Sequence, residues 1–411
     1  MTENHRVLLS LIGSALGNTN VDFKCFRIHW EELYVLALEQ GVQGIVFDSL
    51  EKLQYDMRPP KDLLLKWIAN ITVMERTYAT YVSTIQEIAD IIKAEDLAML
   101  VLKGYGCSLN YPIPHRRPCG DIDIFVMAKD GTHSSDMVKR VNNAITESNK
   151  GTFIHDNDHH SVIQYGKFVI ENHESILDIN THKSSAVLNK LLESLASDCL
   201  QTSQRTNGMV LPSVEFYSIH LLRHMANDFA TVKTTLRHVL DWGTFVAKNN
   251  IDWNFVYKVM HRANMHKFLN AINSICVDYL GYDSKTFRIE KRDDELRDRV
   301  LEDILYSGFQ GKIPSMNNKI SYGLAKACRM WHNRWKYSIV YDESLLSSFL
   351  YSTLNRIKKS NGLFVDFCQS ENSRFPMGIK FFCSMLCNGI NLYLHKERTA
   401  YQACFILNIV N

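Results

Sequence analysis

A long stretch without glycine or proline constrains the N-terminal part of the chain more than any other feature. Neither residue occurs between Pro60 and Gly104, so no helix-breaking residue interrupts this stretch. Apolar side chains recur in it every three or four positions, which places them on one face of a helix. They are Tyr78, Tyr81, Val82, Ile85, Ile88 and Ile92. The pattern changes at residues 97–102, a continuous apolar run that indicates a buried strand.

Helical and strand patterns alternate as far as residue 211. We expect further strands at residues 122–127, 161–165 and 168–179, and a helix at 135–148 with Ser134, Ser135 and Asp136 as candidate caps. Beyond Pro212 the pattern is mostly helical again. The predicted fold class is therefore α+β, with a small mixed sheet and flanking helices between helical N- and C-terminal regions. The predicted boundaries are 1–95, 96–211 and 212–411.

The composition is that of an ordinary globular protein, with 46% hydrophobic and 22% charged residues, which excludes a disordered or fibrous chain. The formal net charge of +2 provides no basic field of the kind that dedicated nucleic-acid binders have. The ten cysteines include no Cys-x-x-Cys pair, so neither a secreted disulfide framework nor a zinc finger is expected.

Two apolar segments bear on location. The N-terminal segment has helical periodicity and no convincing cleavage site. Residues 378–394 contain Lys380 and are too short to span a bilayer, so we expect a buried helix there. Cys383 and Cys387 would share one face of that helix, where small hydrophobic side chains are a better interpretation than a metal site. We expect a cytoplasmic protein with no membrane partner.

Two aspartates occupy the strand at residues 122–127 and its approach. Asp121 and Asp123 are two residues apart, so a strand directs both carboxylates to one face, about 6.6 Å apart along the strand. Ile122 and Ile124 then face a core on the other side. Neighbouring carboxylates raise each other's pKa unless a cation neutralises them, and Mg²⁺ binds one or two carboxylates together with phosphate oxygens.

Glycines surround this pair. Gly104 follows the buried run 97–102 and is placed to begin a helix, whose N–H groups attract phosphate. Gly106 leaves room for close approach of the backbone, and Gly120 provides a turn into the strand. A third acid, Asp178, has apolar neighbours in the run Ser175–Ile179. Three acids on adjacent strands suit a two-metal site for phosphoryl or nucleotidyl transfer.

These motifs resemble the polymerase-β-like nucleotidyltransferase superfamily. Within it, the Leu102-Lys103-Gly104 element and the segment from Arg117 to Val126, which contains Gly-Asp-Ile-Asp, look like the uncharacterised nucleotidyltransferase family. The resemblance covers about residues 25–280 and is most specific at 101–126 and 177–179.

The resemblance implies that Asp121, Asp123 and Asp178 bind the metals and carry the catalysis, Asp178 by helping to activate the attacking hydroxyl. It also implies that Lys103, Gly104, Arg117 and Gly120 bind the nucleotide, with Mg²⁺ or Mn²⁺ as the cofactor and an NTP, ATP foremost, as co-substrate. Two positions depart from the family pattern: Tyr105 replaces a serine that contacts phosphate, and Asn180 replaces a histidine.

Several residues permit two interpretations. Arg116 and Arg117 could bind phosphate or form ion pairs that balance the acidic site. His155, Asp156, Asp158, His159 and His160 resemble a metal cluster, but a polar hairpin loop is the preferred interpretation. Arg237 and Asp241 fit an ordinary helix pair, and His224 a core histidine. The resemblance also makes these last three possible contacts to nucleotide or acceptor.

The function predicted from these observations is transfer of an NMP group from an NTP to a hydroxyl group, with release of pyrophosphate. The acceptor is a small molecule, a peptide or a protein, and nucleic acid is less favoured for want of a basic groove. Two alternatives stay open: a nucleotide-binding regulatory module that has lost catalysis, and a phosphotransferase with the same fold.

Overall fold

The computed structural model describes residues 1–19, 23–157, 159–202, 205–206, 209–231, 234–306, 333–344, 347–348, 351 and 355. The predicted helix at 378–394, with Cys383 and Cys387, lies outside the described residues, as does Asp158. The chain divides into two units, Met1–Ser352 and Thr353–Asn411. Every helix and strand with described bounds lies in the first unit.

The N-terminal region is helical, as predicted. Its helices are α1 (Glu3–Ala15), α2 (Trp30–Glu39), α3 (Gln43–Leu50) and α4 (Lys61–Ala94), with 3-10 turns η1 (Phe23–Cys25) and η2 (Tyr55–Met57) between them. The long helix α4 begins directly after Pro60 and confirms the interpretation of the stretch without glycine or proline. It ends before Asp96, which adopts a left-handed conformation with φ of 58°.

The described residues form one mixed sheet of seven strands in the order β3-β4-β5-β2-β1-β7-β6. The strands are β1 (Ala98–Val101), β2 (Ile122–Met127), β3 (Gly151–Asp156), β4 (His160–Tyr165), β5 (Phe168–His173), β6 (Arg205–Thr206) and β7 (Met209–Val210). At its centre, β2 pairs antiparallel with β1 and parallel with β5. The predicted α+β class with a mixed sheet is therefore confirmed.

One strand prediction was wrong in its extent. The strand expected at residues 168–179 ends at His173, and residues 174–179 form bends and a turn. Asp178 therefore lies in a loop five residues beyond β5, not on a strand. The apolar residues that suggested a strand, Ile176 and Leu177, are buried in the core without joining the sheet.

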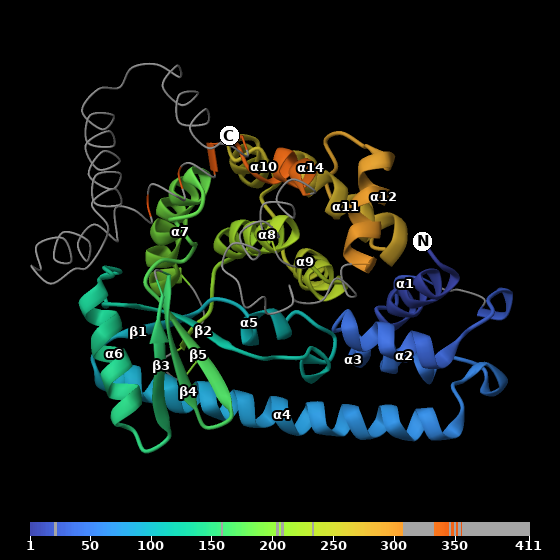
Figure 1. Ribbon diagram of the computed structural model, residues 1–411, viewed down its shortest axis with the longest axis horizontal. Helices are drawn as coiled ribbons and strands as arrows, with labels where there is room; N and C mark the ends of the chain where they lie inside the picture. Colours follow the sequence, from blue (N-terminus) through green and yellow to red (C-terminus); the bar gives the residue numbers. More distant parts are fainter. Residues whose placement is uncertain are drawn as a thin grey trace, which may run out of the picture. The chain divides into compact units, whose positions relative to one another are not determined.

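Helices cover both faces of the sheet. Residues of α4 and of α6 (Ser135–Glu147) form one core with Ile122, Ile124 and Val126 of β2, so the predicted inward face of this strand is confirmed. In Figure 1, α4 and α6 lie along this face. The opposite face carries α7 (Lys183–Thr202) and α8 (Val214–Thr231), whose apolar residues join a second core with Phe125 and Met127.

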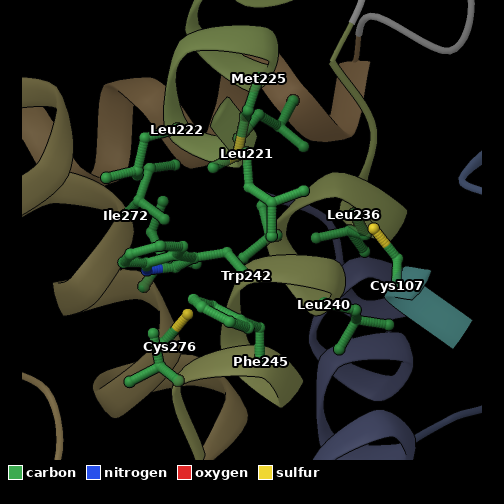
Figure 2. Close-up of a cluster of buried hydrophobic side chains, with 14 of the residues drawn as sticks. Cys107, Leu221, Leu222, Met225, Leu236, Leu240, Trp242, Phe245, Ile272 and Cys276 are labelled. Carbon is green, nitrogen blue, oxygen red and sulfur yellow. The ribbon is translucent and has the colours of Figure 1, made fainter. Parts of the chain in front are cut away.

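The second core extends into the C-terminal helices. These are α9 (Leu236–Lys248), α10 (Trp253–Arg262), α11 (His266–Leu280), α12 (Asp294–Tyr306) and α14 (Arg334–Val340). Trp242 of α9 is fully buried in this core, together with Leu222 of α8 and Ile272 of α11 (Figure 2). Cys107 lies beside Leu240 in the same figure and belongs to α5 (Tyr105–Ser108), the turn that follows β1.

This core contains residues of all three predicted regions, from Val7 to Tyr341. The boundaries at 95 and 211 thus separate parts of the sequence that share one apolar interior, and their assignment as domains stays a prediction. Within the described residues, no helix is long and apolar enough to cross a membrane.

Candidate active site

Asp123 lies where the three central strands meet. It is paired in register with Glu171 of the parallel strand β5, and its carbonyl accepts a hydrogen bond of 3.0 Å from the Leu102 N–H beyond the end of β1. Residues along a strand alternate between its two faces, so Asp123 points away from Ile122 and Ile124 toward α8 and α9. Only 2% of Asp123 is exposed.

Two neighbouring side chains stabilise the negative charge of this buried carboxylate. Lys103 Nζ lies 3.0 Å from Asp123 Oδ1, and His173 Nε2 lies 3.2 Å from the same oxygen. Burial by itself raises the pKa of Asp123, but Lys103 and His173 outweigh it and hold that pKa well below its usual range. Burial likewise lowers the pKa of Lys103, but the Asp123 charge prevails and raises it. Asp123 and Lys103 are therefore both charged at neutral pH.

Asp121 precedes β2 and is exposed. The Tyr81 hydroxyl of α4 donates a hydrogen bond of 3.0 Å to the Asp121 carbonyl and so fixes the backbone at this point. Partial burial and the charge of Asp123 raise the pKa of Asp121. This is the mutual effect of neighbouring carboxylates that the Asp-Ile-Asp spacing predicts.

The glycines have different roles. Gly104 adopts φ of 66°, and a Cβ there would overlap the Tyr81 hydroxyl, so the turn between β1 and α5 requires glycine. The helix that it precedes is a single turn, so any phosphate contact would rely on local N–H groups more than on a helix dipole. The close approach to Gly106 is made by the Tyr217 side chain. Gly120 has open space around it.

Arg117 forms a buried ion pair with Asp241. Its Nε and one terminal nitrogen each donate a hydrogen bond of 2.7 Å to Asp241 of α9, and the Tyr111 hydroxyl donates a third, of 2.8 Å. Asp241 therefore pairs with Arg117. The pair between Arg237 and Asp241 that their helix spacing suggested is not the one observed. Arg116 forms ion pairs with Asp48 and Glu75. These contacts favour the interpretation of both arginines as members of ion pairs. Their partners are not the predicted acids, Asp121, Asp123 and Asp178.

Two cavities lie on the face of the sheet that Asp123 occupies. Cavity A has a volume of about 190 Å³, and six of the predicted site residues line it: Lys103, Gly104, Arg117, Gly120, Asp121 and Asp123. Arg237 also lines cavity A, and its Nε, although buried, has no hydrogen-bond partner among the described residues. Cavity B has a volume of about 260 Å³ and shares Lys103, Asp123 and His224 with cavity A.

The remaining predicted acid, Asp178, lines cavity B. One of its oxygens accepts a hydrogen bond of 2.9 Å from the Asn180 N–H, so the carboxylate is held by its own loop. The structure thus places Asp178 and Asp123 around one cavity. The acid that joins Asp123 on an adjacent strand is a different one, Glu171, and the ligand atoms of Asp123, Glu171 and His173 lie within 4.8 Å of one another.

Glu171 was not predicted from the sequence. Burial and the charge of Asp123 raise its pKa to about 7. A sequence signal exists, because Glu171 and His173 are two residues apart on a strand and therefore share a face, as Asp121 and Asp123 do. Reading residues 168–179 as one strand placed the emphasis on Asp178 instead.

Histidines line cavity B in unusual number. In the segment that was predicted to be a polar loop, His155 and Asp156 belong to β3 and His160 begins β4, so the loop is limited to the turn between these strands. His159 and His160 turn into the cavity and contact His173. Burial, together with the charge of His173, lowers the pKa of His159 to about 2 and that of His160 to about 4. Both imidazoles are therefore neutral at physiological pH.

A second group faces the strands from α8 and α9. His224 Nε2 and His238 Nε2 lie 3.4 and 3.5 Å from Asp228 Oδ2. His238 Nδ1 accepts a hydrogen bond of 3.1 Å from the Thr235 N–H, so in its neutral form the proton of His238 is on Nε2, facing Asp228. His224 and Asp228 line cavity B. His224, predicted as a core histidine, is thus a wall residue of both cavities.

Comparison of the sequence with known proteins identifies the family of the chain. No curated protein and no solved structure matches the chain. A sequence model described as uncharacterised nucleotidyltransferase matches residues 27–281, which is more than half of the chain. The match runs from the residues before α2 to the end of α11 and includes every residue that lines either cavity. The chain therefore belongs to the uncharacterised nucleotidyltransferase family.

Proposed function

We propose that the protein transfers an NMP group from an NTP to a hydroxyl group of an acceptor and releases pyrophosphate. One observation carries the proposal: the buried carboxylate of Asp123 pairs with Lys103 at the shared wall of two adjoining cavities. One cavity adds Asp121, Gly104 and Arg237, and the other adds Glu171 and Asp178. A reaction that joins two substrates at one phosphorus atom requires such adjacent sites.

The residues fit a divalent cation. Asp121, Asp123 and Glu171 provide carboxylate oxygens, the ligands that Mg²⁺ and Mn²⁺ prefer. Burial, and after it the charge of Asp123, raises the pKa of Glu171, and a bound cation would offset both effects. We propose that Asp121 and Asp123 hold the cation with help from Glu171 or Asp178. A bound cation would neutralise charge on the triphosphate and lower the pKa of the attacking hydroxyl.

The remaining residues have roles that follow from their charge and place. In cavity A, Lys103 and Arg237 supply positive charge for the triphosphate, and the turn at Gly104 leaves its backbone open to close approach. The acceptor would enter cavity B, where Glu171 or Asp178 takes the proton of its hydroxyl group. The hydroxyl oxygen then forms a bond to the α-phosphorus, and the bond from that phosphorus to the bridging oxygen breaks, releasing pyrophosphate.

Several finer points belong to the same proposal. ATP is the favoured NTP, and the acceptor is a small molecule, a peptide or a protein. Nucleic acid is less favoured because the net charge is only +2. A cytoplasmic location stays a prediction from the sequence.

The test is incubation of the protein with α-labelled NTPs, Mg²⁺ or Mn²⁺ and fractionated acceptor extracts. The expected result is label on an acceptor together with pyrophosphate, and a loss of at least about 100-fold in Asp121→Asn and Asp123→Asn. Asp56→Asn is the matched control, because Asp56 is an exposed aspartate on η2 that lines neither cavity. Release of ADP would indicate a phosphotransferase instead, and NTP binding without any product would indicate a regulatory module.

A further inference from the structure

A cluster of three histidines lines cavity B, which the acceptor is proposed to enter. His160 of β4 and His173 of β5 are paired in register, and Glu171 lies two residues before His173 on the same face of the sheet. His159 follows the β3–β4 turn and completes the cluster. The ring centroids of His173 lie 4.7 Å from His159 and 5.2 Å from His160. All four side chains line cavity B.

Hydrogen bonds reveal which nitrogens of the cluster carry protons. The Ser175 hydroxyl donates to the Leu177 carbonyl over 2.8 Å, so it must accept from His159 Nδ1 at 3.1 Å. His159 therefore has its proton on Nδ1 and a free lone pair on Nε2. A hydrogen bond of this kind from the far nitrogen orients histidines that bind metals.

Hydrogen bonds also show which nitrogen of His160 is unprotonated. Asn157 Oδ1 accepts hydrogen bonds from the backbone N–H groups of His159 and His160, which identifies the other amide atom as nitrogen. That nitrogen lies 3.0 Å from His160 Nε2 and donates to it, so His160 Nε2 also has a lone pair. Because Asn157 is exposed, its amide can turn to solvent when a stronger electrophile approaches this nitrogen.

The spacing of the ligand atoms fits a single ion. The nitrogens of the three histidines lie within 4.8 Å of one another. A Glu171 oxygen lies 3.6 Å from His160 Nε2. His173 Nε2 donates to Asp123 Oδ1 at 3.2 Å, so the lone pair of a neutral His173 ring is on Nδ1, which is buried and has no hydrogen-bond partner among the described residues. Ligands about 2.05 Å from a tetrahedral Zn²⁺ ion are separated by about 3.4 Å, so small side-chain movements suffice.

The charge of cavity B also favours a cation. Four carboxylates line it, those of Asp123, Glu171, Asp178 and Asp228, against the two cationic side chains of Lys103 and Arg223. Imidazole nitrogens select Zn²⁺ and other transition metals, whereas Mg²⁺ prefers oxygen. The cluster thus differs in chemistry from the carboxylates of Asp121 and Asp123.

We propose that His159, His160, His173 and Glu171 bind a divalent transition-metal ion, with Zn²⁺ the best match to three imidazoles and one carboxylate. Binding requires neither NTP nor acceptor. Since His173 and Glu171 both adjoin Asp123, the ion lies next to the proposed nucleotide site and holds the β3–β4 hairpin against β5.

The test uses the full chain, stripped of metal with EDTA, and Zn²⁺ alone, titrated by calorimetry. Co²⁺ replaces Zn²⁺ in a parallel titration, because its visible absorption reports tetrahedral ligation. We expect one ion per chain in the wild type and in the matched control His155→Gln, whose histidine is exposed on β3. His159→Gln and His160→Gln should each weaken binding by at least tenfold, and excess Mg²⁺ should not displace the ion.

A second variant keeps the outcome decisive if a histidine variant fails to fold. Ser175→Ala removes only the hydroxyl that orients His159, and should weaken binding by about tenfold, with an unchanged circular dichroism spectrum. The proposal is overturned if the wild type binds no Zn²⁺, if the two histidine variants bind it as the control does, if Ser175→Ala leaves the affinity unchanged, or if Mg²⁺ displaces it.

Discussion

Asp123 stays ionised in an almost dry environment because Lys103 and His173 lie beside it. Burial and the charge of Asp123 raise the pKa of Glu171, its neighbour on β5, to about 7. The two carboxylates therefore differ in protonation although they occupy adjacent strands. Carboxylates with perturbed pKa values cluster at acid–base and metal sites.

The raised pKa of Glu171 predicts a pH dependence of stability. The unfolded carboxyl group titrates near its ordinary value of 4.5, and the folded one near 7. The folded state thus holds the Glu171 proton more tightly than the unfolded state does. The contribution of this group to the free energy of unfolding is fully present below about pH 4.5 and declines as the pH rises toward 7. In EDTA, the urea midpoint of the wild type should fall more between pH 5 and 7.5 than that of Glu171→Gln. Equal pH slopes for the two proteins would contradict this prediction.

Two arginines near cavity A should behave differently when substituted. Arg117→Gln leaves Asp241 buried without its partner and should cost about 3–5 kcal/mol in the free energy of unfolding. Arg237→Gln should change stability by less than about 1 kcal/mol but weaken NTP binding, because its guanidinium is free for phosphate. Urea unfolding and titration with a fluorescent ATP analogue measure the two effects. A stable Arg117→Gln protein that no longer binds the analogue would assign the phosphate contact to Arg117.

At the scale of elements, the turn between β1 and α5 depends on the long helix α4. Gly104→Ala brings a Cβ against the Tyr81 hydroxyl and places alanine at φ of 66°, so we expect a loss of about 1–3 kcal/mol. Because the clash involves the hydroxyl, the loss should be smaller when Tyr81→Phe is already present. Gly120→Ala is the control, since open space surrounds Gly120. Denaturant unfolding of the four proteins in the cycle measures the coupling, and equal losses in both backgrounds would exclude the Tyr81 contact as the cause.

The elements that sequence patterns predicted are those in which local pattern and burial agree. Residues 122–127 form β2 as expected, and α4 matches the stretch that lacks glycine and proline. The prediction at 168–179 failed because an apolar run is buried equally well in a loop, as Ile176 and Leu177 are. The histidines 159 and 160 looked like ordinary hairpin residues, since only strand pairing across β4 and β5 brings them to His173. Likewise, nothing local indicates that Asp241 pairs with Arg117, 124 positions away in the sequence.

At the scale of the whole molecule, Gln40 joins parts that lie far apart in sequence. It is fully buried, its amide nitrogen donates to the Ile304 and Leu305 carbonyls of α12, and its oxygen accepts from the Leu236 N–H that begins α9. The N-terminal helices and the C-terminal helices are thereby tied through polar contacts as well as through the shared core around Trp242.

This shared interior predicts that the described residues of the first unit unfold as one cooperative unit, although the sequence suggests three regions. Far-UV circular dichroism and tryptophan fluorescence should give coincident urea transitions, because Trp67 of α4 and Trp242 of α9 belong to the same core. Gln40→Ala leaves the buried Ile304 and Leu305 carbonyls and the Leu236 N–H without their hydrogen-bond partner. The free energy of unfolding should fall by about 1–3 kcal/mol, and both transitions should shift together. Gln54→Ala, in the loop before η2 and exposed, is the matched control and should leave both in place. Separate transitions for the two probes, or a shift of only one of them in Gln40→Ala, would show that the regions fold independently and that the domain boundary at 95 or 211 is real.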